Sequence, residues 1–339
     1  MPDNDLIFIT GASGFIAKHC IAEALRHGFN VRGTLRHMQR ADEVRAAVGE
    51  HGNRLSFVEA DLTRDDGWDA ATRGCRHVLH VASPLPLRQP RDREGLVPIA
   101  RDGTLRVLKA AVAARVERVV VTSSMAAILY GHASRAGRTF TEADWSNPDA
   151  PNISPYAISK TRAERAAWLF METASGETGL VAINPAAVFG PAHDRGVETS
   201  GEIISTLMKG RVPLVPRVGM TVVDVRDVAT AHVAALEKPG VVGRRFIMAA
   251  EGMRLLDLGA VLREAFPDRR RRMPRGELPD FLVRIAGIFD PTARTAAAEL
   301  GSVPQFSNES ARELLGIRFR SGREAAVAMA ESLITLGMA

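Results

Sequence analysis

The chain has 339 residues, of which 46% are hydrophobic and 24% are charged, and its formal net charge is +5. This composition is ordinary for a soluble globular protein with one large domain, or a main domain and a smaller companion. No apolar run approaches the roughly 20 residues of a membrane span, and no basic leader precedes an apolar segment, so we expect neither a membrane-spanning nor a secreted protein.

Cysteine content and charge distribution indicate the cellular compartment and the kinds of partner to expect. Cys20 and Cys75 are too few for a disulfide framework and have no metal-ligand spacing, so we expect a cytoplasmic protein without a metal site. The densest basic run, DRRRRMPRG at 268–276, lies among acidic and apolar residues without interleaved aromatics. A solvated loop or helix end is favoured there over a nucleic-acid patch. We expect no nucleic-acid or membrane partner, and a monomer or homodimer.

Short apolar runs alternate with helical periodicity over the first 186 residues. The expected strands are 6–10, 31–35, 55–60, 77–82, 117–124 and 180–186, and the expected helices are 14–28, 41–49, 66–73, 94–115 and 155–175. Near-continuous Val, Ile and Leu are typical of strands buried on both faces of a parallel sheet. The repeated strand–helix units predict an α/β fold, a Rossmann-type doubly wound parallel sheet with right-handed crossovers.

After residue 186 this rhythm breaks. Prolines and glycines cluster at 184–196 and 209–220, as in loops that line a site. A strand and helix around 222–236 and a strand at 244–250 are expected to return to the main sheet. We therefore predict a dinucleotide-binding domain over 1–186, to which 221–250 return. The prediction adds a smaller, mostly helical substrate-binding region from 187–220 and 251–339.

A glycine turn directly follows the first expected strand. In TGASGFIA (10–17), Gly11 and Gly14 are followed by Ala17 at the third position of a G-x-x-G-x-x-A pattern. Small residues at such a turn let the backbone approach a pyrophosphate, and the following helix offers N–H donors and a positive dipole end. The context of strand before and helix after predicts dinucleotide binding.

The end of the second expected strand indicates which dinucleotide is bound. An NAD site usually places an acid about 20 residues after the glycine turn, where it binds the ribose 2′-hydroxyl. Here the sequence is GTLRHMQR (33–40), with no acid before Asp42. Arg36 occupies this position, and a guanidinium suits a 2′-phosphate. We therefore predict NADP(H) as the cofactor.

The segment SPYAISK (154–160) holds one of only two tyrosines and one of five lysines. Ser154 and Pro155 are typical of a capped helix start. Tyr156 and Lys160 then lie four residues apart, on one helix face. A nearby ammonium lowers the pKa of a phenol toward the range in which it can act as a general acid. By spacing alone an ordinary surface pair is the commoner explanation.

The fifth expected strand supplies a third polar group. Its sequence RVVVTSS ends in Thr122, Ser123 and Ser124, and ligands of doubly wound sheets bind beyond the carboxyl ends of the strands. A hydroxyl there can bind a substrate oxygen beside a tyrosine. The order of nucleotide turn, strand-end serine and Tyr–Lys helix favours a catalytic role for the pair.

These segments together resemble one known family. The motifs TGASGFIA, ADLT, VLHVASP, VVVTSS, YAISK and NPAAVFGP are similar to those of the extended short-chain dehydrogenases/reductases. Within that family the likeness is to the dihydroflavonol 4-reductase, cinnamoyl-CoA reductase and aldehyde reductase group. It extends from residue 5 to about 235, and more loosely over 306–320. No flavonoid-binding residues can be assigned between 125 and 155, so a flavonoid substrate is not carried over.

The resemblance implies specific roles. Tyr156 would be the proton donor, Lys160 its activator and holder of the nicotinamide ribose, and Ser124 the catalytic serine, with Ser123 the other candidate. The implied cofactor-binding residues are Gly11, Ser13, Gly14, Phe15, Ile16, Thr34, Arg36, Asp61, Leu62, Ala82, Ser83, Tyr156, Lys160, Pro185 and Val188.

The sequence thus predicts an NADPH-dependent reductase that converts a ketone or aldehyde to an alcohol with a Ser–Tyr–Lys triad. Two alternatives stay open: an NAD-dependent nucleotide-sugar epimerase or dehydratase of the same fold, and a non-catalytic dinucleotide-sensing protein. The histidines near the expected site loops, His80, His132 and His193, have no metal-ligand spacing, and we expect them to be packing or surface residues.

Overall fold

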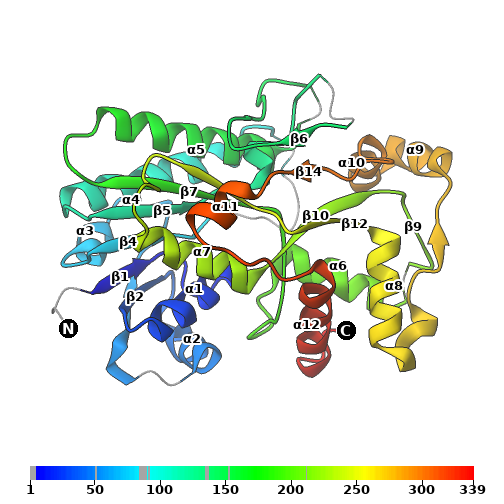
Figure 1. The fold of residues 1–339 in the computed structure, drawn as a ribbon, viewed down its shortest axis with the longest axis horizontal. Coiled ribbons are helices and arrows are strands. Elements are labelled where there is room, and N and C mark those ends of the chain that lie inside the picture. Colours follow the sequence, from blue (N-terminus) through cyan, green and yellow to red (C-terminus); the bar gives the residue numbers. More distant parts are fainter. Residues whose placement is uncertain are drawn as a thin grey trace.

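A seven-stranded parallel sheet dominates the computed structural model, which describes residues 5–49, 52–83, 90, 92–133, 137–151, 153–210 and 212–339 (Figure 1). The strand order is β11-β7-β5-β4-β1-β2-β3. The strands are β1 (Leu6–Ile9), β2 (Asn30–Leu35), β3 (Leu55–Glu59), β4 (His77–His80), β5 (Arg118–Thr122), β7 (Gly179–Pro185) and β11 (Arg245–Met248). All neighbouring pairs are parallel, which confirms the predicted Rossmann-type fold.

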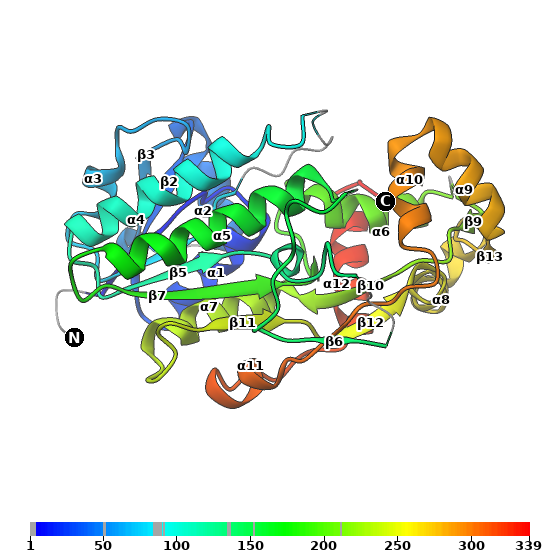
Figure 2. The same ribbon diagram turned by 90° about the horizontal axis from the view of Figure 1, so that it is seen from above.

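Helices cover both faces of this sheet (Figures 1 and 2). One layer holds α3 (Trp68–Thr72), α4 (Gly103–Ala113) and α5 (Pro155–Thr173), and the other holds α1 (Phe15–Arg26), α2 (Ala41–Val48) and α7 (Val225–Glu237). Successive strand residues point to opposite faces, so Ile7 and Ile9 pack in the core under α1, whereas Phe8 packs with Trp68 and Leu108 in the other. Burial of both faces explains the continuous apolar strands in the sequence.

The helix that precedes β5 departs from the prediction of one regular helix over 94–115. It begins near residue 97 and opens with a π turn, Pro98–Asp102, before α4 continues as a regular helix. A π turn accommodates one residue more than the regular hydrogen-bond ladder and is frequent at functional sites. Here the turn packs against α5.

A second, three-stranded sheet lies beyond the carboxyl ends of the main strands. Its order is β12-β10-β8, and its strands are β8 (Ala187–Phe189), β10 (Gly219–Asp224) and β12 (Glu251–Arg254). The expectation that a strand from 222–236 returns to the main sheet is wrong, because Val222 and Val223 pair with Ala187 and Val188 instead. Only the following helix α7 and strand β11 return to the main sheet.

Most of the remaining helices lie at the far end of the molecule from β1 (Figure 1), whereas the short turns at 38–40 and 52–54 lie beside the main sheet. The helices are α6 (Glu198–Met208), α8 (Leu255–Ala265), α9 (Asp280–Phe289), α10 (Pro291–Ala298), α11 (Glu309–Leu314) and α12 (Gly322–Thr335), with short 3₁₀ turns η1 (Met38–Arg40), η2 (Gly52–Arg54), η4 (Met125–Ala127) and η5 (Pro267–Arg272). Two short strand pairs join β9 (Leu214–Val215) to β13 (Gly276–Glu277) and β6 (Thr139–Phe140) to β14 (Gln305–Phe306). No helix was assigned between the two expected loop segments 184–196 and 209–220, yet α6 lies there and packs against α12.

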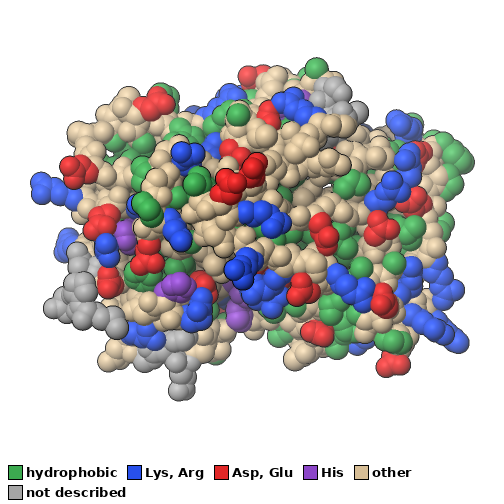
Figure 3. Space-filling model, viewed as in Figure 1, with side chains coloured by type: hydrophobic (Ala, Val, Ile, Leu, Met, Phe, Trp, Pro, Cys, Tyr) green, Lys and Arg blue, Asp and Glu red, His purple; other side chains and the backbone are tan. Residues whose placement is uncertain are grey.

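The surface carries charges of both signs. On the face drawn in Figure 3, Lys and Arg side chains are interspersed with Asp and Glu. In the described part of the chain, no helix combines the length and apolarity that crossing a bilayer requires.

Candidate active site

The candidate residues lie in a row at the carboxyl ends of six neighbouring strands. Pro185 ends β7, Ser123 and Ser124 follow β5, Ala82 and Ser83 follow β4, Gly11 follows β1, Thr34 and Arg36 lie at the end of β2, and Asp61 and Leu62 follow β3. This edge is where open α/β sheets bind their ligands. The order of the strands places the predicted catalytic residues at one end of the row and the predicted 2′-phosphate site at the other.

Gly11 is required by the geometry of the turn after β1. Its φ of +68° lies in the left-handed region, and a Cβ at this position would come within 2.9 Å of the Ala82 Cβ. The Gly11 N–H donates to Thr34 Oγ1 at 2.9 Å, and Gly14 N donates to Gly11 O at 2.9 Å. The turn is therefore locked between the ends of β2 and β4, with no side chain between its backbone and a ligand.

The first turn of α1 suits an anion. Gly14 is its N-cap, no acidic residue lies in the turn, and the free N–H groups and helix dipole therefore favour negative charge. The Phe15 ring is buried against the His19 ring, with centroids 5.4 Å apart, and Ile16 packs partly against the same core. Phe15 can therefore serve a cofactor only through its backbone groups, whereas the Ile16 side chain is only partly buried.

The other end of the row carries Arg36 and Asp61. Arg36 is exposed, and no acid precedes it at the end of β2. The Asp61 carboxylate accepts hydrogen bonds from Thr63 N and Thr63 Oγ1, both at 2.8 Å, and these bonds hold the pKa of Asp61 below its usual value, with a smaller contribution from Arg36. Leu62 packs against Gly103 at the start of α4. The arrangement leaves a guanidinium at the place where an NADP site needs one.

A buried chain of hydrogen bonds runs beneath the glycine turn. Ala82 N donates to Thr10 Oγ1 at 2.9 Å, and Thr10 Oγ1 lies 2.9 Å from His80 Nδ1. His80 Nε2 lies 3.2 Å from Thr104 Oγ1, which donates to Ala100 O in the π turn at 2.8 Å. Because the Thr104 hydroxyl proton is committed to Ala100, His80 must donate from Nε2 and accept at Nδ1.

The neutral His80 ring therefore connects α4 to the nucleotide turn. Burial, and then the charge of Lys160, lower its pKa to about 3. The ring fixes the backbone of Ala82, which touches Gly11. This agrees with the sequence expectation that His80 is a packing residue. His132 binds Ile128 O at 2.6 Å, and His193 stacks on His19 with centroids 4.3 Å apart.

The two adjacent serines after β5 have different partners. Ser123 donates its hydroxyl hydrogen to Glu164 on the buried side of the sheet edge. Ser124 has extended backbone angles, so its side chain points the other way, and its Oγ accepts a hydrogen bond from Ala126 N at 3.1 Å at the start of η4. Among the described residues nothing accepts the Ser124 hydroxyl hydrogen, which supports Ser124 over Ser123 as the candidate catalytic serine.

Tyr156 and Lys160 occupy the first two turns of α5. Ser154 caps the helix, its Oγ accepting from Ala157 N at 3.2 Å, and Pro155 follows it as the sequence predicted. Tyr156 is half-buried, and Lys160 is buried with its Nζ donating to Thr122 O at 3.0 Å. The lysine therefore joins α5 to the strand end that carries Ser124, and η4 packs against the same helix.

Pro185 and Val188 mark the passage between the two sheets. Pro185 is buried at the end of β7 and pairs with Met248, whereas Val188 lies in β8 and pairs with Val223. They border the end of the row where the catalytic residues lie.

Three polar residues buried behind Ser124 were not predicted from the sequence. Glu164, Asn184 and Arg245 form one hydrogen-bonded cluster. Arg245 is too far along the chain to be linked to the others by sequence. The available signal was Glu164, which lies one turn beyond Lys160 on the same helix face.

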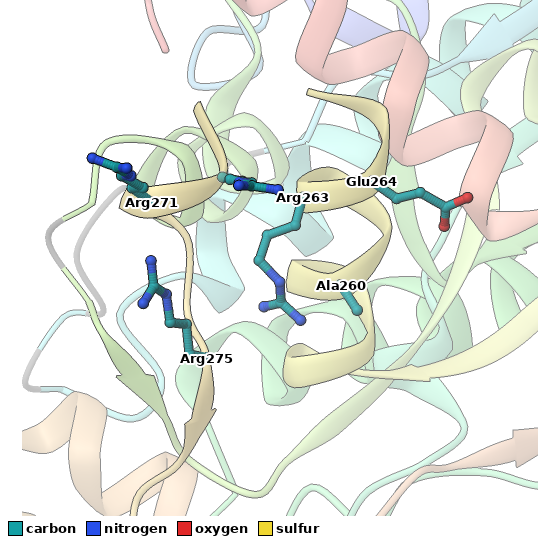
Figure 4. Close-up of a pocket in the computed structure, with 6 residues that line it drawn as sticks. Ala260, Arg263, Glu264, Arg271 and Arg275 are labelled. Carbon is teal, nitrogen blue, oxygen red and sulfur yellow. The ribbon is translucent and has the colours of Figure 1, made fainter. Parts of the chain in front are cut away.

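One of two cavities in the structure lies at this site, and the other lies away from it. The larger, of about 600 Å³, lies between α8 and the segment after it and is lined by Ala260, Arg263, Glu264, Arg270, Arg271 and Arg275, with the Glu264 carboxylate pointing away (Figure 4). It contains none of the candidate residues. The smaller, of about 20 Å³, is lined by Lys160, Glu164 and His80 among others, and is large enough for one water molecule. Among the described residues no group of three or more His, Cys, Asp or Glu side chains could hold a metal ion.

Comparison with known proteins identifies the family. The model of the NAD dependent epimerase/dehydratase family matches residues 7–249. The chain belongs to this family. The resemblance to the extended short-chain dehydrogenases/reductases is thereby confirmed.

Similar proteins include reductases from fungi and plants. The chain is 31% identical to the NADPH-dependent methylglyoxal reductase GRE2 of Saccharomyces cerevisiae, over 94% of this chain and 95% of that protein. It is 33% identical to the cinnamoyl-CoA reductase CAD2 of Medicago truncatula, over 78% and 81%. The crystal structure of yeast methylglyoxal/isovaleraldehyde reductase Gre2 complexed with NADPH superposes with a TM-score of 0.82 at 28% identity, covering 98% of this chain and all of that one.

Proposed function

We propose that the protein is an NADPH-dependent reductase that converts a ketone or aldehyde carbonyl to an alcohol. The observation that carries this proposal is the hydrogen bond from Lys160 Nζ to Thr122 O, 3.0 Å long. It joins the helix of the predicted acid, Tyr156, to the strand end of Ser124, at the edge where the fold binds dinucleotides. The similar yeast and plant proteins, which are named as reductases, support the same activity.

The chain's own residues fit NADP(H). The pyrophosphate would be held by the Gly11 backbone and the first turn of α1; a Cβ at Gly11 would occupy the space beside that backbone. Arg36 would hold the 2′-phosphate. Asp61 and Leu62 would border the adenine, and Ala82, Ser83, Pro185 and Val188 the nicotinamide half. When bound, the cofactor supplies the hydride.

The protein's part is to orient the carbonyl and to move one proton. Ser124 donates a hydrogen bond to the carbonyl oxygen, and Tyr156 delivers the proton to that oxygen as it becomes an alcohol. Lys160 stabilises the phenolate that remains, because an ammonium nearby favours the charged form of a phenol. Its bond to Thr122 O keeps the ammonium under the cleft.

The decisive experiment tests a panel of small aldehydes and ketones as substrates with NADPH. The loss of absorbance of the reduced cofactor measures the reaction. We expect stoichiometric conversion to alcohol, and a higher kcat/KM with NADPH than with NADH. Tightly retained NAD with no net consumption of NADPH would point to an epimerase or dehydratase. NADPH binding without turnover of any carbonyl would point to a sensing protein.

We also infer that the protein works in a reducing compartment such as the cytoplasm, as a monomer or a homodimer. Cys20 and Cys75 are both buried and unbonded to each other, which supports a reducing environment. Light scattering coupled to size-exclusion chromatography measures the oligomeric state directly.

A further inference from the structure

Glu164 continues the helix face that carries the predicted acid and its lysine. It lies four residues after Lys160 and eight after Tyr156, so the three side chains follow one another at single-turn intervals along α5. Its side chain is only 1% exposed. A carboxylate so buried is costly unless donors surround it.

Donors from four elements surround the Glu164 carboxylate. They are Ser123 Oγ after β5, Asn184 Nδ2 on β7 at 2.8 Å, Arg245 Nε on β11 at 2.6 Å, Arg245 Nη2 at 3.3 Å and Trp168 Nε1 on α5 at 3.3 Å. The carboxylate is therefore the point at which three strands and the catalytic helix meet.

Arg245 extends this cluster toward the loop between Ser124 and α5. Its Nη1 donates to Glu142 O and Asp144 O, both at 2.7 Å, and its guanidinium lies 3.8 Å from the centre of the Trp145 ring. Its remaining N–H groups face Glu164. The pair therefore fixes residues 142–145 to the sheet edge beside the candidate site.

Asn184 makes the direct connection to the catalytic serine. Its Nδ2 donates both to Glu164 and to Ser124 O, the latter at 3.2 Å. Its Oδ1 is buried without a hydrogen-bond partner among the described residues, so the place of this side chain depends on its two N–H groups. This bond restrains the peptide plane after Ser124 and so positions the Ser124 backbone, while Ala126 N holds the Ser124 Oγ.

We propose that Glu164, Arg245 and Asn184 form a positioning network that aligns Ser124 with Tyr156 and Lys160 for carbonyl reduction. This inference rests on the proposed function. None of the three residues needs to touch substrate or cofactor; they act through the serine backbone, the 142–145 segment and the face of α5. Misplacement of reacting groups by about 1 Å can cost about 10²-fold in rate, so we expect their loss to lower kcat rather than cofactor binding.

Because the network is charged, its loss should change the pH dependence of the reaction, which the loss of an uncharged packing contact would not do. The groups that face Glu164 are Arg245 from β11, Lys160 from α5 and the neutral His80 from β4, the last two lining the same small cavity. Glu164→Gln leaves Arg245 without its counter-charge. Loss of the negative charge at position 164, eight residues and therefore about 12 Å along α5 from Tyr156, stabilises the phenolate about tenfold at an effective dielectric constant of about 20.

The experiment compares Glu164→Gln and Asn184→Ala with Glu172→Gln, an exposed carboxylate at the other end of α5. For Glu164→Gln we expect kcat to fall about 10–10²-fold, KM for NADPH to stay within about twofold, and the tyrosine limb of the pH–rate profile to move to lower pH. Asn184→Ala should lower kcat similarly without moving the limb, because no charge is lost. Glu172→Gln should change neither quantity.

A folded Glu164→Gln protein with normal kcat and an unmoved pH limb would overturn the proposal. If that variant does not fold, Asn184→Ala decides: normal kcat there overturns the proposal, and reduced kcat with retained NADPH binding supports it. Failure of the wild-type protein to reduce any carbonyl with NADPH would instead refute the proposed function, before any variant is made.

Discussion

Ser123 and Ser124 are adjacent in sequence, but the structure assigns them opposite surroundings. The hydroxyl of Ser123 is used by Glu164, whereas that of Ser124 lies at the start of η4 and only accepts from the backbone. Side chains alternate along an extended chain, so the two hydroxyls lie on opposite sides of the strand end.

Exchange of each serine for alanine separates these roles. We expect Ser124→Ala to lower kcat about 10²-fold, because a donor to the developing oxyanion is lost, and to destabilise the fold by about 0.5–2 kcal/mol, because Ala126 N loses its acceptor. Ser123→Ala should lower kcat less than tenfold and destabilise the fold by about 1–3 kcal/mol, because a buried carboxylate loses a donor. Kinetics and denaturant unfolding measure both, and the reverse pattern would make Ser123 the catalytic serine.

Tyr156 has a natural control within the chain, because Tyr130 is the only other tyrosine. Tyr156→Phe should lower kcat by about 10²–10⁴-fold while NADPH binding changes little, since only the proton donor is removed. Tyr130→Phe should stay within a few-fold of wild type. Steady-state kinetics and NADPH titration are the measurements, and near-normal turnover by the Tyr156 variant would remove this residue from the mechanism.

At the scale of elements, the strand–turn–helix unit around Gly11 requires both a left-handed backbone and space beside Ala82, and these two requirements can be tested separately. Gly11 combines a φ of +68° with a close approach to Ala82, whereas Gly28 has a φ of +93° and nothing within 4 Å of a Cβ. Gly28→Ala should therefore cost only the left-handed backbone, about 1–2 kcal/mol. Gly11→Ala should cost more and weaken NADPH binding at least tenfold, as measured by denaturant unfolding and fluorescence titration. Equal effects of the two would show that the contact with Ala82 is unimportant.

The main sheet was predictable because its strands carry a local signal. All seven strands lie within two residues of the predicted ranges, since burial on both faces makes each strand a continuous apolar run. The helix α6 was missed because its sequence, ETSGEIISTLM, contains Gly, Ser and Thr, which are poor helix formers, and it is stabilised by packing on α12. The second sheet joins β8, β10 and β12, and pairings between such distant segments leave no local pattern.

The site divides in the same way. The location of Gly11, Ser124, Tyr156 and Lys160 at one edge of the sheet was predictable, because each sits at a diagnostic place in a strand–turn–helix unit, whereas their roles stay predictions. The network behind them was not, because Glu164 and Arg245 lie 81 residues apart. In sequence such residues look like ordinary members of a charged surface.

For the molecule as a whole, buried histidines should set its tolerance of acid. Burial is the main cause that lowers the pKa of His19, His77 and His232 to about 4 and of His80 to about 3. The unfolded chain therefore binds more protons than the folded one between these values and about 6.5, and stability falls as pH drops through this window. Asp227, whose pKa burial raises, opposes this trend only weakly.

Each such histidine contributes up to about 1.4 kcal/mol per pH unit, so the four together should remove about 5 kcal/mol between pH 7.5 and 5.5. That is a large fraction of the about 5–15 kcal/mol typical of a folded protein. Urea unfolding at the two pH values measures the loss, and His232→Gln should reduce it by about a quarter. A free energy of unfolding that is the same at both values would show that these rings are protonated without unfolding.

The π turn before α4 affects which mutations this part of the chain tolerates. A π turn holds one residue more than the regular helical hydrogen-bond ladder uses. Deletion of one residue from 98–102 would restore a regular helix. The residues before the deletion would then be rotated by about 100° about the helix axis relative to those after it. Thr104 would then lose either His80 or Ala100 as its partner. Insertions and deletions in this short segment should therefore be far less tolerated than substitutions.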